Sequence, residues 1–224
     1  HIAGISEGNA GDPSPATAYG VFQGLKAAVL FRMKKDTLTG IKVAVQGLGH
    51  VGYGLCELLK EAGAKLIVAD INEANVSKAV DQLGAVAVGI EEIYDQDVDV
   101  FAPCALGAIL NDNTIPRLNA YIVAGSANNQ LAEAHHANIM TARGLLYAPD
   151  YAINAGGIIL ISHEGPKFNR EKAMRHVGGI YDTCLDIFKR AERENMTTAE
   201  IADRIALERL EKARNDKRKL ALAS

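Results

Sequence analysis

Three glycines, Gly47, Gly49 and Gly52, follow the apolar run 41–46 with the spacing Gly-x-Gly-x-x-Gly. Glycine allows a tight turn, a close approach of backbone to phosphate and close packing of the next helix, because it has no Cβ. A helix expected at about 50–62 would direct its first N–H groups at that phosphate. The pattern predicts a dinucleotide site, and its pyrophosphate-binding segment would be Gly47, Leu48, Gly49, His50, Val51 and Gly52.

A carboxylate ends the second apolar run, 65–69. Asp70 would lie at the carboxyl end of a strand, where it can accept hydrogen bonds from an adenosine ribose, with Ile71 beside it. Its negative charge would repel the 2′-phosphate of NADP, and no Arg or Lys occurs between Asp70 and Lys78 to offset that repulsion. The sequence therefore favours NAD as the cofactor.

Three loops with small or amide-bearing residues follow later apolar runs, at 103–107, 125–130 and 148–157. Small residues let backbone approach a flat ring, and Asn128 and Asn154 offer the paired donor and acceptor that a carboxamide needs. An alternative is that these asparagines only end strands and cap helices.

The elements that must position these residues alternate between strand and helix. We expect a long helix at 13–33, strands at 42–46, 65–69, 85–88, 98–102, 121–124 and 145–147, and helices at 50–62, 73–83 and 131–140. After Tyr151 only helices are expected, at 152–163, 170–194 and 198–216. The fold class is therefore α/β, a doubly wound (Rossmann-like) parallel sheet with a C-terminal helical appendage. The expected division is a dinucleotide-binding domain at 1–150 and C-terminal helices at 151–224.

Composition describes an ordinary globular chain: 224 residues, 48% apolar, 23% charged, with a net charge of −3. We expect no membrane span, no signal peptide and no nucleic-acid partner, and we interpret the basic residues near the C-terminus as a solvated helix face. Three widely spaced cysteines suggest neither disulfides nor a thiolate metal site, so a reducing, cytoplasmic location is expected.

Two further candidates for chemistry are set aside. His135 and His136 are adjacent and would point about 100° apart on a helix, so we expect surface or capping roles and no metal. Cys104 has no activating histidine in a recognisable motif, so packing near the cofactor ring is favoured over a nucleophilic role.

Several long motifs together resemble one family. They are 11–20 (GDPSPATAYG), 47–52 (GLGHVG), 102–107 (APCALG), 125–130 (GSANNQ) and 147–157 (YAPDYAINAGG), with further similarity at 168–174 and 179–182. The chain resembles the leucine, phenylalanine and valine dehydrogenases of the superfamily that includes glutamate dehydrogenase, with the leucine dehydrogenases nearest. The resemblance spans nearly the whole chain.

The resemblance implies reversible, NAD-dependent oxidative deamination of an amino acid to its 2-oxo acid and ammonia. It places the nicotinamide and its ribose near Cys104, Ala105, Ala127 and Asn128, with Ser14 and Thr17 also at that end and Asn154 on the carboxamide or substrate. It places Ile158 and Ile161 in the substrate side-chain pocket, with ordinary core as the alternative, since an apolar pair at i and i+3 is common on buried helix faces. Two branched aliphatic residues suggest a branched-chain, leucine-like substrate.

The lysines that carry out catalysis in this family lie in a Gly-Gly-x-Lys segment and nearby in a separate domain. Here Gly-Gly occurs only at 156–157 and 178–179, and neither pair is followed by such a lysine. The chain also opens, at 1–6, in what resembles the linker to the first long helix. We expect a cofactor domain separated from its N-terminal catalytic domain by design, proteolysis or gene truncation, without catalytic residues and inactive alone. The alternative is a non-catalytic NAD-sensing or assembly module. The family also suggests a homo-oligomer.

Overall fold

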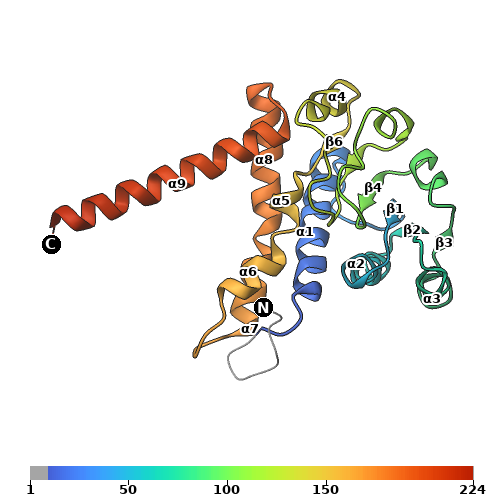
Figure 1. Cartoon of the computed structure of the whole chain (residues 1–224), viewed down its shortest axis with the longest axis horizontal. Coiled ribbons are helices and arrows are strands. Elements are labelled where there is room, and N and C mark those ends of the chain that lie inside the picture. The colour runs from blue at the N-terminus through green and yellow to red at the C-terminus, as the bar shows by residue number, and fades with distance from the viewer. Residues whose placement is uncertain (1–9, 224) are drawn as a thin grey trace.

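The computed structural model describes residues 10–223, and side chains as far as Asp216 (Figure 1). The strands are β1 (Lys42–Gln46), β2 (Lys65–Ala69), β3 (Val86–Ala87), β4 (Val100–Pro103), β5 (Ile122–Val123) and β6 (Leu146–Tyr147). The helices are α1 (Ser14–Met33), α2 (His50–Glu61), α3 (Glu73–Leu83), α4 (His136–Ala142), α5 (Asp150–Ile153), α6 (Gly156–Ser162), α7 (Arg170–Gly178), α8 (Ile180–Glu194) and α9 (Thr198–Ala223), with 3-10 turns η1 (Glu92–Asp95) and η2 (Ile115–Arg117).

The six strands form one parallel sheet in the order β3-β2-β1-β4-β5-β6. This order reverses direction between β1 and β4, and in such sheets ligands bind at that switch point, outside the carboxyl ends of the strands. The predicted fold class, an α/β doubly wound sheet followed by helices, is confirmed.

Both faces of the sheet are buried, because successive side chains of a strand point to opposite sides. On β1, Val43 and Val45 join the core beneath α1, α2 and α8, whereas Ala44 joins a second core. On β4, Val100 and Phe101 divide in the same way. The second core is closed by η1, η2 and α4 and not by long helices, so this face has the thinner cover.

The long helix α1 connects the sheet to the C-terminal helices. It packs against α2 on one side and α8 on another, and Phe31 of α1 lies 5.7 Å from Phe188 of α8 between ring centroids. Most of α9 extends away from the rest of the molecule (Figure 1), and its residues 206–216 are all exposed.

The expected helix at 131–140 is wrong at its start, because α4 begins only at His136. The preceding segment pairs instead with the chain after β4, where Leu131 bridges Leu110 and the Ala132 N–H donates to the Leu110 carbonyl at 3.0 Å. A tertiary partner thus takes the hydrogen bonds that a helix would have used.

Two other expected helices are divided. The helix expected at 152–163 is interrupted at Asn154 and Ala155, between α5 and α6, and the one expected at 170–194 is interrupted at Gly179, between α7 and α8. No helix in the described part of the chain is both long and apolar enough to cross a membrane. The opening segment 1–6, interpreted as a linker, lies outside the described residues.

Candidate dinucleotide-binding site

The three glycines have different environments. Gly47 has φ +98°, and a Cβ there would lie 2.8 Å from Ala105 N, so this turn and the loop after β4 touch. A Cβ on Gly52 would lie 2.0 Å from the Gly47 carbonyl oxygen, which holds α2 against the end of β1. A Cβ on Gly49 would meet nothing within 4 Å. Gly49 therefore borders open space at the start of α2, as a residue facing a pyrophosphate should.

Asp70 is held by backbone N–H groups of two neighbouring loops, the glycine turn after β1 and its own loop after β2. One carboxylate oxygen accepts the Leu48 N–H from the glycine turn, and the other accepts the Asn72 N–H at 2.7 Å. These bonds fix the carboxylate beside the glycine turn. Ile71, which follows it, is 85% exposed, so its side chain is available to a flat ring at this end.

The first lysine after Asp70 is engaged elsewhere. Lys78 Nζ lies 3.8 Å from the centroid of the Tyr53 ring on α2, a cation–π contact. Lys78 is therefore not placed to act as a cationic partner for a 2′-phosphate beside Asp70.

The loops after β4 and β5 are packed backbone to backbone. The Cys104 N–H donates to Gln46 O at 2.7 Å, the Ala127 N–H donates to Pro103 O at 2.9 Å, and a Cβ on Gly125 would lie 2.2 Å from that same oxygen. Ala127 is buried and Ala105 is exposed. Burial raises the pKa of the Cys104 thiol, with hydrogen bonds from Ser126 opposing it, so the thiol stays protonated and is a poor nucleophile.

The two asparagines predicted to act together do meet. Asn154 Nδ2 donates to Asn128 Oδ1 at 2.7 Å and lies 3.3 Å from Ser126 O. Asn154 is the residue that follows α5, at the interruption in the expected helix. The arrangement presents an amide pair at the same sheet edge as the glycine turn.

Two positioning residues were missed by sequence reasoning. Gln130 is fully buried, and its Nε2 donates to Gly125 O at 3.0 Å and Ala127 O at 2.9 Å. Buried Asp150 accepts the Gln130 N–H at 2.8 Å. Together they shape the loop that carries Asn128. Both residues lie in the loops 125–130 and 148–157 that the sequence already marks as candidate site loops, but a polar residue in a loop does not show whether its side chain is buried against the backbone or exposed.

The first turn of α1 packs against α6, the helix that follows Asn154. A Cβ on Gly156 would lie 2.2 Å from Ala16 O, and one on Gly157 would lie 2.6 Å from Thr17 Oγ1, so the two helices touch closely. Ser14 is half-buried beside Asp12, whose pKa is lowered mainly by the Ser14 N–H, with charge on His50 contributing. The α1 terminus and the glycine turn are therefore neighbours.

The pair on α6 is not core. Ile158 is 70% exposed and Ile161 is 46% exposed, which removes the alternative of ordinary packing within the described chain. A groove of about 980 Å³ lies beside the glycine turn, between α1, α2 and α3. It includes Ser14, Leu48, Gly49 and His50 but none of the predicted residues after β2, β4 or β5, so it borders only part of the candidate site.

The histidine pair differs from expectation in its geometry. His135 is exposed and precedes α4, as expected for a surface role, but His136 is only 2% exposed, and its Nδ1 accepts the Glu133 N–H at 2.9 Å in the turn before the helix. Neither side chain caps α4. The expected 100° separation does not apply, because His135 is outside the helix and the ring centroids are 4.2 Å apart.

The strand order, the glycine turn at the switch point and the carboxylate at the end of β2 define a doubly wound nucleotide-binding type of domain. A family model described as Glutamate/Leucine/Phenylalanine/Valine dehydrogenase matches residues 8–79 and 68–218. The chain belongs to this dehydrogenase family.

Comparison with individual relatives gives the same family. The chain is 51% identical over 216 residues to leucine dehydrogenase of Thermoactinomyces intermedius, covering 96% of this chain and 59% of the relative. It is 48% identical over 224 residues to L-tryptophan dehydrogenase of Nostoc punctiforme, covering all of this chain and 63% of the relative. A crystal structure of the Nostoc punctiforme enzyme superposes with TM-score 0.88 and 46% identity, over 91% of this chain and 61% of that one. The chain thus spans about three fifths of the length of these relatives.

Proposed function

We propose that this chain is the NAD-binding part of an enzyme that interconverts a branched-chain L-amino acid with its 2-oxo acid and ammonia. The observation that carries the proposal is the 2.7 Å bond between Asn154 and Asn128, at the sheet edge that also holds Gly49 and Asp70. A site for a simple nucleotide needs the glycine turn and the carboxylate, but it does not need an amide pair two strands away.

The residues fit NAD. Open space at Gly49 accommodates the pyrophosphate, the Asp70 carboxylate accepts from the adenosine ribose, and the amide pair orients the nicotinamide carboxamide. The chemistry that bound NAD would supply is acceptance of the hydride from the substrate Cα. We assign no catalytic proton transfer to the described residues, whose role is to bind and orient the cofactor.

The substrate preference is part of the proposal. Exposed Ile158 and Ile161 lie one turn apart on α6, which begins two residues after Asn154, so they can form one wall of an apolar pocket near the nicotinamide. Branched aliphatic side chains suit leucine-like substrates. The relatives include both leucine and tryptophan dehydrogenases, and the complete enzyme turning over phenylalanine or tryptophan faster than leucine would contradict this assignment.

We further propose that the complete enzyme is a homo-oligomer and is located in the cytoplasm. Exposed Leu207 and Leu210 on α9 support association into an oligomer. The cytoplasmic location is supported by Cys56, Cys104 and Cys184, which are all free thiols.

The test is calorimetric titration of this chain with NADH, NADPH and ADP, beside an assay of leucine-dependent NAD reduction. We expect NADH to bind more tightly than NADPH, because of Asp70, and more tightly than ADP, because of the amide pair, with no turnover. NADH binding no tighter than ADP would favour the alternative of an NAD-sensing or assembly module, which does not use the nicotinamide end. Turnover by the chain alone would contradict our assignment of catalysis to groups outside it.

A further inference from the structure

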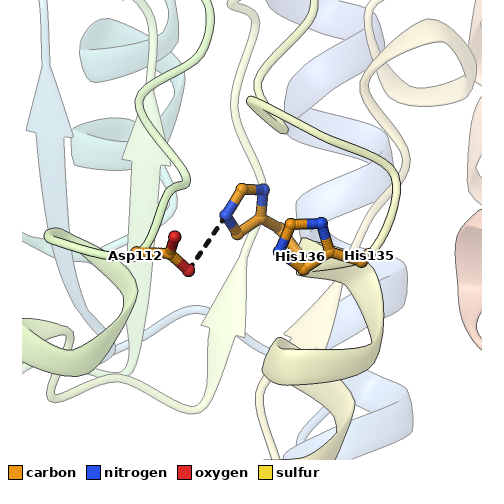
Figure 2. A group of neighbouring side chains, drawn as sticks. All are labelled: Asp112, His135 and His136. Carbon is orange, nitrogen blue, oxygen red and sulfur yellow. Dashed lines mark ion pairs between the residues drawn. The ribbon is translucent and has the colours of Figure 1, made fainter.

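A group of metal-binding side chain types lies outside the dinucleotide site. Asp112, in the loop between β4 and η2, approaches His135 and His136 at the start of α4 (Figure 2). One nitrogen of each imidazole and one Asp112 carboxylate oxygen lie within 4.8 Å of one another. The fold thus brings the adjacent pair His135 and His136 together with Asp112, which lies more than twenty positions earlier in the sequence.

The buried nitrogen of His136 faces this point without a hydrogen-bond partner. His136 is 2% exposed, and its Nε2 lies 3.4 Å from Asp112 Oδ1. That separation is long for an N–H···O hydrogen bond, which spans about 2.7–3.2 Å. It equals the distance of about 3.4 Å between two ligand atoms that each lie ~2.1 Å from a tetrahedral zinc ion. An unpartnered buried polar atom requires an explanation, and a shared cation supplies one.

The Nδ1 nitrogen of each imidazole lies near Glu133. His136 Nδ1 lies 3.1 Å from the Glu133 carbonyl oxygen, and His135 Nδ1 lies 3.3 Å from Glu133 Oε2. A metal-binding histidine typically donates its second N–H to a carbonyl or carboxylate, which leaves the first nitrogen unprotonated for the ion. In the structure the Glu133 N–H donates to His136 Nδ1 at 2.9 Å, so the neutral ring carries its proton on Nε2. Ion binding would therefore have to move this proton to Nδ1 and replace the Glu133 N–H contact by donation to the Glu133 carbonyl oxygen.

We propose that Asp112, His135 and His136 form a binding site for a divalent transition-metal ion, best matched by Zn²⁺, with water completing the coordination. Two imidazoles and one carboxylate suit Zn²⁺, whereas Mg²⁺ and Ca²⁺ prefer oxygen ligands throughout. The side chains of Asp112 and His135 are 77% and 52% exposed, so both can rotate to close the remaining gap around the fixed His136.

The ion would join two segments that already pair. The Ala108 N–H donates to Asn129 O at 2.7 Å, and the Leu110 N–H donates to Gln130 O at 2.9 Å, so the chain after β4 runs beside the chain after β5. These are the segments that hold Ala105 and Asn128 at the dinucleotide edge. A bound ion would clamp them at their far end and raise the melting temperature of the chain.

The experiment is equilibrium dialysis of this chain against Zn²⁺ and, separately, Mg²⁺, with thermal melting in parallel. Asp112→Asn and His135→Gln remove one ligand each at exposed positions, so both variants should fold. Because loss of an outer partner alone weakens metal binding 10–100-fold, we expect each variant to bind Zn²⁺ more weakly by at least about tenfold. Zinc should raise the melting temperature of the unsubstituted chain and not that of either variant.

Two matched control variants test whether acidic or histidine side chains elsewhere in the chain bind the ion. Asp81→Asn makes the same acid-to-amide change at an exposed position of α3, and His163→Gln removes one member of the other histidine pair, whose Nε2 lies 2.9 Å from His176 Nδ1. Both should leave zinc affinity unchanged. Unchanged affinity in Asp112→Asn and His135→Gln, loss of affinity in His163→Gln, or equal binding of Mg²⁺ would each overturn the proposal.

Discussion

Two glycines of the same motif should respond oppositely to substitution by alanine. Gly49→Ala places a methyl group in open space at a φ of −65°, so we expect stability to be retained and NADH binding to weaken. Gly52→Ala places it 2.0 Å from Gly47 O, so α2 must shift at a cost of about 1–3 kcal/mol. Thermal melting and NADH titration of both variants check this, and equal melting temperatures would contradict the close contact.

Asn154→Ala tests the nicotinamide end. The substitution removes the donor that lies 2.7 Å from Asn128 Oδ1 and one partner of the proposed carboxamide. A hydrogen bond contributes about 0.5–1.5 kcal/mol net, so NADH affinity should fall about two- to tenfold while ADP affinity stays the same. Asn138→Ala, an exposed amide on α4, is the matched control. A parallel loss of ADP affinity would mean that Asn154 supports the loop and not the ring.

At the residue scale, the roles of side chains whose type and position are informative alone were predictable from the sequence. The roles of side chains that only position other groups were not. Asp70 could be placed because a carboxylate after a β-strand is informative without knowledge of its neighbours. Gln130 and Asp150 act through each other and through backbone carbonyls of another loop, so their role exists only in the folded chain. His136 is a similar case, because its burial depends on contacts that no local pattern reports.

Among the elements, the C-terminal helices are held by a charged network that should depend on pH. Arg190 of α8 donates two hydrogen bonds of 2.9 Å to the Glu208 carboxylate of α9. Arg190 holds the pKa of Glu208 below its ordinary value of 4.5, and Arg193 and Arg190 do the same for Glu194. A lowered pKa in the folded state stabilises the fold above the unfolded-state pKa, and this stabilisation is lost as pH falls through the folded value.

We therefore expect the difference in melting temperature between the unsubstituted chain and Glu208→Gln to be constant near neutral pH and to shrink below about pH 4.5. Glu192→Gln, an exposed position on α8, should show no such pH-dependent difference. A difference for Glu208→Gln that does not shrink at any pH below 4.5 at which the chain stays folded would contradict this dependence on carboxylate charge.

Element type and order were largely predictable, and interruptions were not. The strands β1 and β2 and the helix α3 occupy the predicted residues, because an uninterrupted apolar run or a helical stripe between clear caps is a local signal. Periodicity continues across Asn154 and Gly179, so each pair of helices was predicted as one. The division near Asn154 follows from α6 packing on α1, where Gly156 must sit against Ala16 O.

For the whole molecule, α1 unites the sheet and the C-terminal helices in one core. Val21 and Leu25 of α1 share this core with Val43 of β1 and with Ile187 of α8. The edge of the sheet that carries Gly49, Asp70 and Asn128 is thus supported from one side by the sheet and from the other by helices that follow it in sequence. Among the parts of the molecule that this core leaves uncovered are residues 206–216 of α9.

That uncovered half leads to a prediction about association. Residues 206–216 of α9 are exposed, and Leu207 and Leu210 are 61% and 56% exposed on a helix that extends away from the body of the molecule (Figure 1). Apolar side chains at i and i+3 share one helix face, and such a face tends to be buried against another chain. We expect light scattering to show an apparent mass that rises with concentration. The double substitution Leu207→Asp and Leu210→Asp should lower it, whereas Asn215→Asp, which adds charge on the same helix, should not. A constant monomeric mass at high concentration, or an equal effect of Asn215→Asp, would show that this helix face does not drive association.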